Sequence, residues 1–248
     1  MSEEWCAGVD GCRGGWFVVL LRCPGEGIGG EAIEEMRHSL CQSFDEVLAL
    51  PERPARLAVD MPIALLDEAR PGGRACDREA RKLLGDRRSS VFTPPARRVL
   101  AARDYGEALI LSRASSDAQL GLSRQAWNIV PRIKEVDERM TPVLQARIVE
   151  SHPELAFLTL AGLPMRHNKK VDEGRQERLQ LLKRAYGRHL VDPQAIRGRY
   201  GRHRPALDDV LDACALALVA RRILLGLGRC LPGNATVDAK GLRMEIWY

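Results

Sequence analysis

Four aspartates stand at the ends of apolar segments, and their spacing suits the binding of a divalent cation. Asp10 and Asp60 each follow a short apolar run that is typical of a buried strand. Asp209 and Asp212 lie three residues apart at the start of a long apolar helix, so they share one face of it. Like charges on an apolar helix face cost stability, and proteins accept this cost where a cation binds. The four residues therefore predict a carboxylate metal site.

A cluster of this kind suits the hydrolysis of phosphodiester bonds. Two Mg²⁺ or Mn²⁺ ions about 3.5 to 4 Å apart generate hydroxide at neutral pH and stabilise the leaving oxygen. These hard cations prefer oxygen ligands, which favours carboxylates over His and Cys. The residue types are therefore compatible with phosphodiester hydrolysis that uses Mg²⁺ or Mn²⁺ as cofactor.

Each aspartate also has a structural interpretation. Asp10 precedes a glycine in DGCRGG, and Asp before Gly is an ordinary turn signal. Asp208 is expected to be the N-cap of the late helix, and the helix dipole favours acids there, which accounts for Asp208 and in part for Asp209. Asp212 lies one turn further along among apolar residues, so a cap does not explain it.

The strands that position these acids follow from apolar runs and turn signals. The runs 6–9 and 16–21, separated by the glycine-containing DGCRGG, predict a β-hairpin with Asp10 near its mouth. Further strands are expected at 31–38, after a Gly-rich turn, and at 57–59 and 146–149, and the tail 236–248 predicts a hairpin or strand. Helical patterns are expected at 44–50 with Ser43 as N-cap, 76–85, 103–115, 123–140, 153–162 and 207–228, and the segment 164–187 is expected to contain a basic loop followed by a helix.

The block at about 67–145 is mostly helical and rich in Arg, and no flexible linker separates it from the rest. We therefore expect one domain, 1–248, with this block as a helical insertion after the fourth strand. Pro131 is expected to kink or end the helix in which it lies. Residues 87–98, RRSSVFTPPARR, are expected to form a loop because of their prolines and serines.

A fifth acid and several basic residues complete the candidate sites. Glu150 ends the strand expected at 146–149 and is a candidate catalytic residue; His152 and Glu154 beside it have no assigned role. Arginine forks and hydroxyls in a loop suit phosphate oxygens. The candidate nucleic-acid contacts are Arg87, Arg88, Arg97, Arg98, Lys169 and Lys170. The alternative is that these side chains are solvated or paired within the insertion.

Composition fits a globular protein with an anionic partner. The chain has 248 residues, 45% of them hydrophobic, and a net charge of +5 from 38 basic and 33 acidic residues. This mild excess permits nucleic acid as a partner without requiring it. The seven cysteines are scattered singly with no C-x-x-C pair, which argues against a zinc site or a disulfide framework. The chain shows neither a membrane-spanning run nor a signal-peptide pattern, so no membrane partner and a cytoplasmic location are expected, with a homodimer possible.

Seven motifs occur in order along the chain: GVDGCRGGW, VDMPI, CDREAR, RRSSVFTPP, SRQAWNIVPRIKEVD, ESHPE and DDVLDA. Together they resemble the RNase H-like superfamily, particularly its bacterial Holliday-junction resolvase branch. The set is most similar to the predicted nuclease family known as domain of unknown function four hundred and twenty-nine. The resemblance implies an α/β RNase H-like fold, in which helices flank a mixed β-sheet, with a helical insertion and a divalent-metal site. It further implies that Asp10 is the first-strand metal bridge, Asp60 the fourth-strand ligand, and Asp209 and Asp212 the helix acids.

Two other functions remain open. The actin, Hsp70 and sugar-kinase ATPases share this fold class and hold phosphate with a strand-hairpin-strand, a part that DGCRGG could play. Those proteins use two such domains, whereas this sequence shows one glycine hairpin of that type. The third possibility is a non-catalytic nucleic-acid-binding module in which the arginines bind and the acids are relics.

Overall fold

The computed structural model describes residues 4–23 and 33–248. They form two compact units. The first comprises Met1–Asp60, Arg147–Arg229 and Trp247–Tyr248, and the second comprises Met61–Ala146 and Cys230–Ile246. The second unit thus contains the inserted block together with a segment near the carboxyl terminus, while the description of the chain as one domain stays a prediction.

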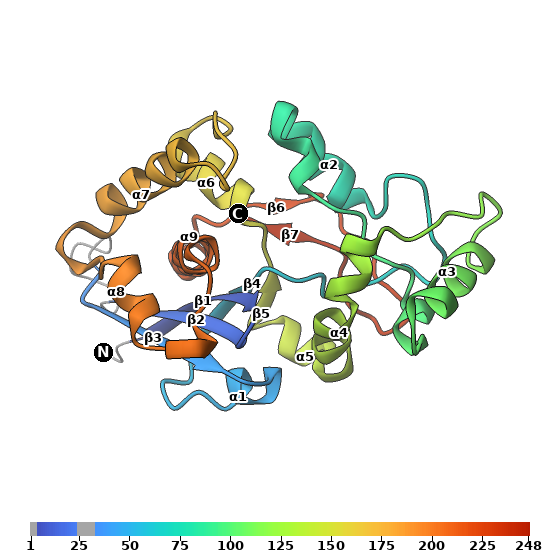
Figure 1. The fold of residues 1–248 in the computed structure, drawn as a ribbon, viewed down its shortest axis with the longest axis horizontal. Helices are drawn as coiled ribbons and strands as arrows, with labels where there is room; N and C mark the ends of the chain where they lie inside the picture. The colour runs from blue at the N-terminus through green and yellow to red at the C-terminus, as the bar shows by residue number, and fades with distance from the viewer. Residues whose placement is uncertain (1–3, 24–32) are drawn as a thin grey trace. The chain divides into compact units, whose positions relative to one another are not determined.

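The first unit is built on a five-stranded mixed sheet (Figure 1). Its strands are β1 (Glu4–Cys12), β2 (Gly15–Cys23), β3 (Glu35–Cys41), β4 (Arg56–Val59) and β5 (Ile148–Glu150). They lie in the order β3-β2-β1-β4-β5, with β2 antiparallel to β1 and β3, and with β4 parallel to β1 and β5. This order and these directions are those of the RNase H-like fold, so the predicted fold class is confirmed.

The hairpin at the start of the chain is longer than the sequence suggests. Its strands pair from Glu4 opposite Cys23 to Cys12 opposite Gly15, which leaves a two-residue turn. Asp10 pairs with Phe17 inside this ladder, so it lies in a strand and does not cap the turn. The strand expected at 31–38 is β3, which begins later; residues 31 and 32 and the Gly-rich turn before them lie outside the described residues.

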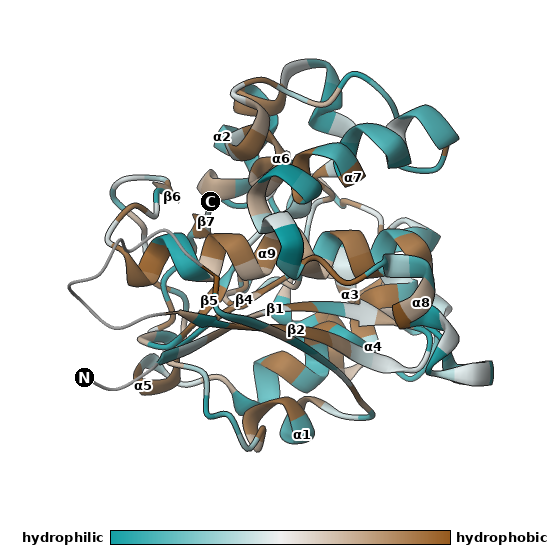
Figure 2. Cartoon of the chain, turned by 90° about the vertical axis from the view of Figure 1, so that its left-hand side faces the viewer, coloured by the Kyte–Doolittle hydropathy of each residue, from teal (hydrophilic) through white to brown (hydrophobic). Residues whose placement is uncertain are grey.

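One helix covers one face of this sheet. Helix α9 (Leu207–Leu224) is buried on every residue from Val210 to Ala220. It packs on the even-numbered side chains of β1 and on Phe17, Val19 and Leu21 of β2. Figure 2 shows α9 on one side of the sheet and α1 (Phe44–Leu48) on the other. A helix that is apolar all round must be enclosed by other elements, and α6 (Pro153–Ala161), α7 (Asp172–Tyr186) and α8 (Pro193–Gly198) also contact α9.

Gly8 sets how closely α9 approaches β1. A Cβ atom at this position would lie 2.1 Å from both the Ala213 carbonyl oxygen and the Ala217 backbone nitrogen. Only a glycine fits where two backbones approach this closely. The alanines on the facing stripe of α9 keep the helix side of the contact equally small. Gly8 therefore brings the start of α9 against the end of β1.

The remaining helices of this unit surround α9 and the sheet. They are α6 (Pro153–Ala161), α7 (Asp172–Tyr186), α8 (Pro193–Gly198) and the 3₁₀ helices η3 (Gly187–His189) and η4 (Gly201–His203). Two predicted caps agree with the structure, because Ser43 caps α1 through the backbone N–H of Glu46 and Pro153 opens α6. The prediction of Asp208 as N-cap is wrong. Helix α9 begins at Leu207, and the Asp209 carboxylate accepts the Ala206 N–H at 2.7 Å, so an acid inside the first turn does the capping.

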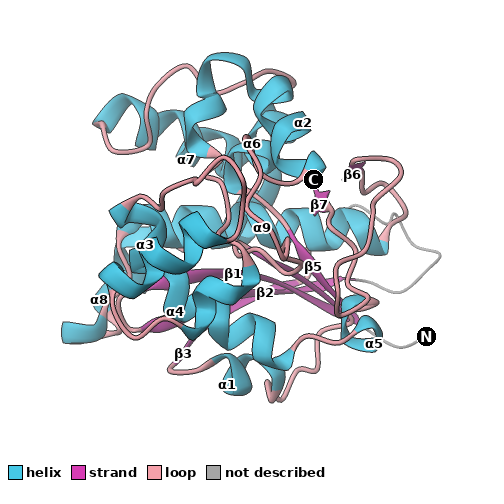
Figure 3. Ribbon diagram, turned by 90° about the vertical axis from the view of Figure 1, so that its right-hand side faces the viewer, coloured by secondary structure: helices cyan, strands magenta, loops and turns pink. Residues whose placement is uncertain are grey.

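The second unit is mainly helical (Figure 3). Its elements are α2 (Ala75–Leu84), η1 (Gly85–Ser90), η2 (Arg97–Ala101), α3 (Tyr105–Ala114), α4 (Arg124–Arg139), α5 (Pro142–Gln145) and β6 (Cys230–Leu231). Strand β6 pairs with β7 (Ile246–Trp247), of which Ile246 is assigned to the second unit and Trp247 to the first. In the CDREAR motif, Asp77 forms a buried ion pair with Arg74 at 2.7 Å, which gives this acid a structural role.

One prediction for this unit needs correction. The loop expected at 87–98 is shorter, because its first and last residues lie in the 3₁₀ helices η1 and η2. Helix α4 runs through Pro131, so of the two effects expected of this proline, a kink or a helix end, the structure excludes the helix end. Of the strand or hairpin expected at 236–248, the structure has β7 and one antiparallel bridge between Val237 and Arg243.

Within the described parts of the chain, no helix combines the length and apolar character needed to cross a membrane.

Candidate metal centre

Three of the predicted aspartates converge in the first unit. Asp10, Asp60 and Asp212 each offer a carboxylate oxygen, and these three oxygens lie within 4.8 Å of one another. Asp212 is 1% exposed and Asp10 is 7% exposed, while Asp60 is half-buried. Residues separated by up to about 200 positions thus form one acidic cluster that opens to solvent through Asp60.

The register of the sheet explains why Asp10 and Asp60 meet. Val9 pairs with Val59 in the parallel ladder, and the Asp60 N–H donates to the Val9 carbonyl at 2.9 Å. The two aspartates therefore occupy neighbouring positions on adjacent strands, and side chains in register point to the same face. That face is the one covered by α9, so Asp212 in the second turn of α9 lies over them.

The same register separates Glu150 from the cluster. Glu150 pairs with Val59, one position before Asp60, and its side chain therefore points to the opposite face of the sheet. Ser151, which follows Glu150, lies next to Asp60 instead, and its N–H donates to the Val59 carbonyl at 2.9 Å. Glu150 is buried, but it is not one of the three carboxylates that converge.

Asp209 lies beside the three acids without joining them. Its Oδ2 accepts the Ala206 N–H, so one of its oxygens is already engaged in capping α9. Asp209 is nevertheless close enough to raise the pKa values of Asp10 and Asp60. Of the two helix acids singled out in the sequence, Asp212 is thus the one that faces the cluster.

Lys169 reaches into the cluster from the loop between α6 and α7. Its ammonium contacts Asp212 Oδ2 at 2.5 Å, and its charge also acts on Asp10 and Asp60. The sequence interpretation assigned Lys169 and Lys170 together to nucleic acid. The structure distinguishes them, because the side chain of Lys170 is exposed while Lys169 makes a partly buried ion pair.

Burial and mutual repulsion disturb the ionisation of all these acids. Burial, followed by repulsion from Asp60 and Asp212, raises the pKa of Asp10 well above its ordinary value. Burial also raises the pKa values of Asp60 and Asp212 to about 6, even though Lys169 opposes the shift in both cases. For Lys169, burial disfavours the charged form, but Asp212 and Asp10 outweigh it and raise its pKa. A single lysine therefore does not compensate the charge of the cluster.

The donor set fits a hard divalent cation. Asp212 Oδ1 is buried and accepts no hydrogen bond from any residue that the structure describes. A buried carboxylate oxygen without a partner costs about 1 to 3 kcal/mol or more. A cation held by Asp10, Asp60 and Asp212 would remove this cost and the repulsion among the three acids. Oxygen ligands of this kind suit Mg²⁺, Mn²⁺ or Ca²⁺.

These raised pKa values predict that the metal-free protein loses stability as the pH rises. Between about pH 4 and 6, the folded chain binds more protons at Asp60 and Asp212 than the unfolded chain does. The free energy of unfolding should therefore fall through this interval, by on the order of 5 kcal/mol, because the pKa of each of the two groups rises from about 4 in the unfolded chain to about 6 in the folded chain. Urea denaturation in EDTA at several pH values measures it.

The control for this pH effect is Asp60→Asn, which removes one of the two groups. Its stability should depend less on pH, and it should exceed that of the unchanged protein at pH 7.5 but not at pH 4.5. One result would contradict the assignment. It is an increase in wild-type stability between pH 4.5 and 7 that is larger than the increase for Asp60→Asn.

A second buried ion pair lies near Asp212. Arg178 Nη2 donates to Glu154 Oε1 at 2.6 Å, and both side chains are almost fully buried. Glu154 is near enough to raise the pKa of Asp212. Sequence reasoning missed Arg178, although a signal existed. It occupies the same four-residue repeat as the other buried residues of α7, which are Gly174, Leu182 and Tyr186.

The predicted phosphate-binding arginines lie in the second unit and differ from one another. Arg97 is committed to ion pairs, with Asp137 at 3.1 Å and with Asp238. Arg88 and Arg98 are exposed, and Arg87 is half-buried. Contact between these arginines and phosphate therefore stays a prediction. Replacement of the exposed Arg88 and Arg98 is the most direct way to test it.

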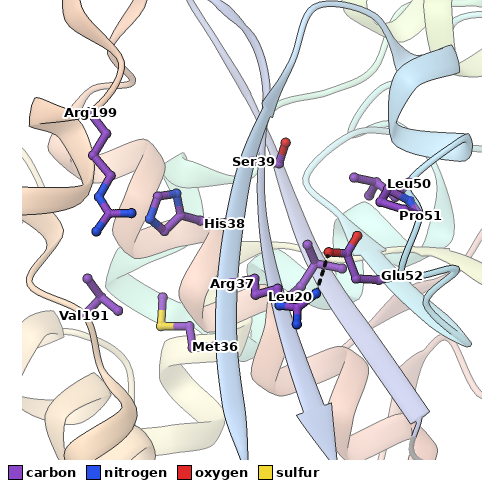
Figure 4. Close-up of a pocket in the computed structure, with 10 residues that line it drawn as sticks. All are labelled: Leu20, Met36, Arg37, His38, Ser39, Leu50, Pro51, Glu52, Val191 and Arg199. Carbon is purple, nitrogen blue, oxygen red and sulfur yellow. Dashed lines mark hydrogen bonds and ion pairs between the residues drawn. The ribbon is translucent and has the colours of Figure 1, made fainter.

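A cavity of about 430 Å³ lies elsewhere in the first unit, along the edge strand β3 (Figure 4). Met36, Arg37 and His38 of β3 line it together with the segment around Glu52, to which Arg37 is paired at 3.3 Å. No acid of the cluster lines this cavity. His38 in turn bonds through Nδ1 to the Tyr200 hydroxyl at 2.6 Å, which attaches the Arg-rich segment around Tyr200 to the sheet.

Comparisons with known proteins give one family and one distant structure. The chain is similar to the solved structure described as Thermus thermophilus RuvC, with 13% identity, 90% of this chain and 98% of that chain covered, and a TM-score of 0.37. No curated protein matches significantly. The family described as "Protein of unknown function (DUF429)" matches residues 8–237. Since this match covers most of the chain, the protein belongs to the DUF429 family.

Proposed function

We propose that this protein is a divalent-metal-dependent nuclease that hydrolyses phosphodiester bonds of nucleic acid at the cluster of Asp10, Asp60 and Asp212. The observation that supports it most is the buried Oδ1 of Asp212, which has no hydrogen-bond partner among the described residues and lies beside two further carboxylates. A fold has no need of such an arrangement for stability, because three crowded acids destabilise the metal-free protein. The RNase H-like sheet provides the rigid support on which two of the acids stand.

The roles of the side chains follow from their positions. Asp10 and Asp60 would hold the cation from adjacent strands, and Asp212 would hold it from α9. The bound cation supplies a hydroxide at neutral pH and stabilises the leaving oxygen. Asp60 is the most solvent-accessible of the three acids, so substrate would approach from its side. Mg²⁺ and Mn²⁺ are the proposed cofactors, because all three ligands are oxygens.

The alternatives have weaker support. An ATPase of the actin and Hsp70 type needs two domains that enclose a nucleotide, and residues 4–23 and 33–248 contain a single five-stranded sheet. A non-catalytic nucleic-acid-binding module would not require three carboxylates to converge around an unpartnered oxygen. Binding of nucleic acid without cleavage is therefore an outcome of the test below.

Cleavage assays with purified protein test the proposal. We expect cleavage of at least one of four substrates, namely duplex DNA, single-stranded DNA, RNA and a branched junction, in Mg²⁺ or Mn²⁺ but not in EDTA. Ca²⁺ should also bind to the site, but cleavage in Ca²⁺ should be slow. Absence of divalent-cation binding in calorimetry would contradict the proposal, and binding of nucleic acid with no cleavage in any metal would favour the non-catalytic module.

The exposed arginines of the second unit give a separate prediction about nucleic-acid binding. If Arg88 and Arg98 neutralise phosphates, the double replacement Arg88→Ala with Arg98→Ala should weaken binding of all sequences. It should also flatten the log-log dependence of affinity on salt by about one unit for each phosphate that is no longer neutralised. Fluorescence anisotropy with a short duplex and a single strand at several salt concentrations measures the slope. Arg97→Ala is no suitable control, because its ion pairs hold the unit together.

The appropriate control is Arg103→Ala, which removes an exposed arginine that precedes α3 and pairs with Glu107 in the first turn of that helix. It should leave the slope unchanged. Equal slopes for the wild type and the Arg88/Arg98 double variant would remove this part of the chain from the binding surface.

A further inference from the structure

Lys169 is placed at the acidic cluster by a rigid support. The Arg166 and His167 N–H groups donate to the Glu177 carboxylate at 3.0 and 3.1 Å. Arg178 donates to the His167 carbonyl from within α7. A Cβ atom on Gly174 would lie 2.0 Å from the Asn168 carbonyl oxygen, so the loop rests directly on the helix backbone. These contacts hold the residues just before Lys169 on α7 and direct its ammonium to the acids.

The contacts of Lys169 occupy ligand atoms that a second metal ion would need. Its ammonium takes Asp212 Oδ2, so Asp212 offers one oxygen, Oδ1, to a cation. Asp209, the fourth acid of the group, has its Oδ2 bound to the Ala206 N–H. The converging set is therefore three carboxylates and one ammonium, and this ammonium occupies the oxygen through which Asp212 would contact a second divalent ion.

We propose that Lys169 is a built-in second cation, so that the cluster holds one divalent ion per chain instead of two. This inference rests on the proposed function and specifies the metal content of the same site. The positive charge of the Lys169 ammonium neutralises the Asp212 carboxylate, as a second metal ion would do. In the absence of metal, it is also the group that partly offsets the repulsion among Asp10, Asp60 and Asp212.

Counting bound Mn²⁺ by electron paramagnetic resonance tests this without relying on activity. The wild type should bind one ion, and so should Lys170→Met, which removes the exposed neighbouring charge. Lys169→Met should either take up a second ion or bind its one ion at least about tenfold more tightly, because a positive charge beside the ion is gone. Lys169→Arg, which keeps the positive charge, should behave as the wild type.

Lys169→Gln repeats the test if the Met variant does not fold, since it keeps a donor for Asp212 without the charge. Two ions bound to the wild type would overturn the inference. So would Lys169→Met or Lys169→Gln matching Lys170→Met in both number and affinity. A wild type that binds no ion, or an Asp10→Asn variant that binds normally, would instead contradict the proposed function itself.

Discussion

Asp10→Asn should abolish metal-dependent cleavage while leaving the metal-free protein as stable as the wild type or more stable. Asp10 is buried beside Asp60 and Asp212, and both acids raise its pKa. Asn keeps the shape of the side chain but removes one anionic ligand and the repulsion it causes. Loss of the cation should lower the cleavage rate by at least about a thousandfold, or about 4 kcal/mol of transition-state stabilisation.

Two measurements check this result together. Cleavage in Mg²⁺ and Mn²⁺ reports the loss of activity, and thermal melting in EDTA reports the stability of the metal-free chain. Glu150→Gln is the matched control, because it removes a buried carboxylate on the opposite sheet face and should retain cleavage. A melting temperature of Asp10→Asn below that of the wild type would show that Asp10 serves the fold.

Gly8→Ala should be among the most destabilising single replacements in the first unit. The new methyl group would lie 2.1 Å from backbone atoms of α9, and backbone cannot rotate away as a side chain can. Helix α9 must then move off the sheet, which we expect to cost about 3 kcal/mol or more. The same movement would withdraw Asp212 from Asp10 and Asp60, so Mn²⁺ affinity should fall as well.

Urea denaturation of Gly8→Ala and of Gly198→Ala provides the comparison. Gly198 is at the end of α8 in the same unit, and a Cβ atom there would meet no described atom within 4 Å apart from its chain neighbours and the backbone of its own helix. Its replacement should leave stability and metal binding nearly unchanged. A Gly8→Ala variant as stable as Gly198→Ala would show that α9 can shift at no cost.

The sheet was predictable from the sequence to the extent that apolar periodicity determines it. Buried β1, β2 and β4 stand out as apolar runs, and the order of the motifs indicated the RNase H-like fold. Boundaries were less predictable, because polar residues such as Asp10 and Arg13 occur inside or next to the ladder of the first hairpin. Pro131 shows the same limit in a helix, since packing in the second unit keeps α4 continuous through a residue that locally disfavours it.

For the acidic cluster, position in the sequence indicated which acids stand at strand ends but not which face they take. Glu150 and Asp60 both lie at the end of a strand, and a difference of one position in register places them on opposite faces. Lys169 could not be separated from Lys170 by composition, because the contact that distinguishes them is tertiary. The sequence likewise did not show which of the adjacent acids Asp208 and Asp209 caps α9, because the cap is a hydrogen bond to the Ala206 N–H that only the structure shows.

The long separation between β1 and the helix that covers it has a consequence for synthesis of the chain. At about 5 to 20 residues per second, the roughly 200 residues between Asp10 and Asp212 take a ribosome about 10 to 40 s. During this time the first hairpin can form, but Phe17, Val19 and Leu21 have no α9 to pack against. The nascent sheet therefore presents an apolar face until α9, in about the last fifth of the chain, emerges, and we expect the yield of folded protein to depend on how well that face is shielded during translation.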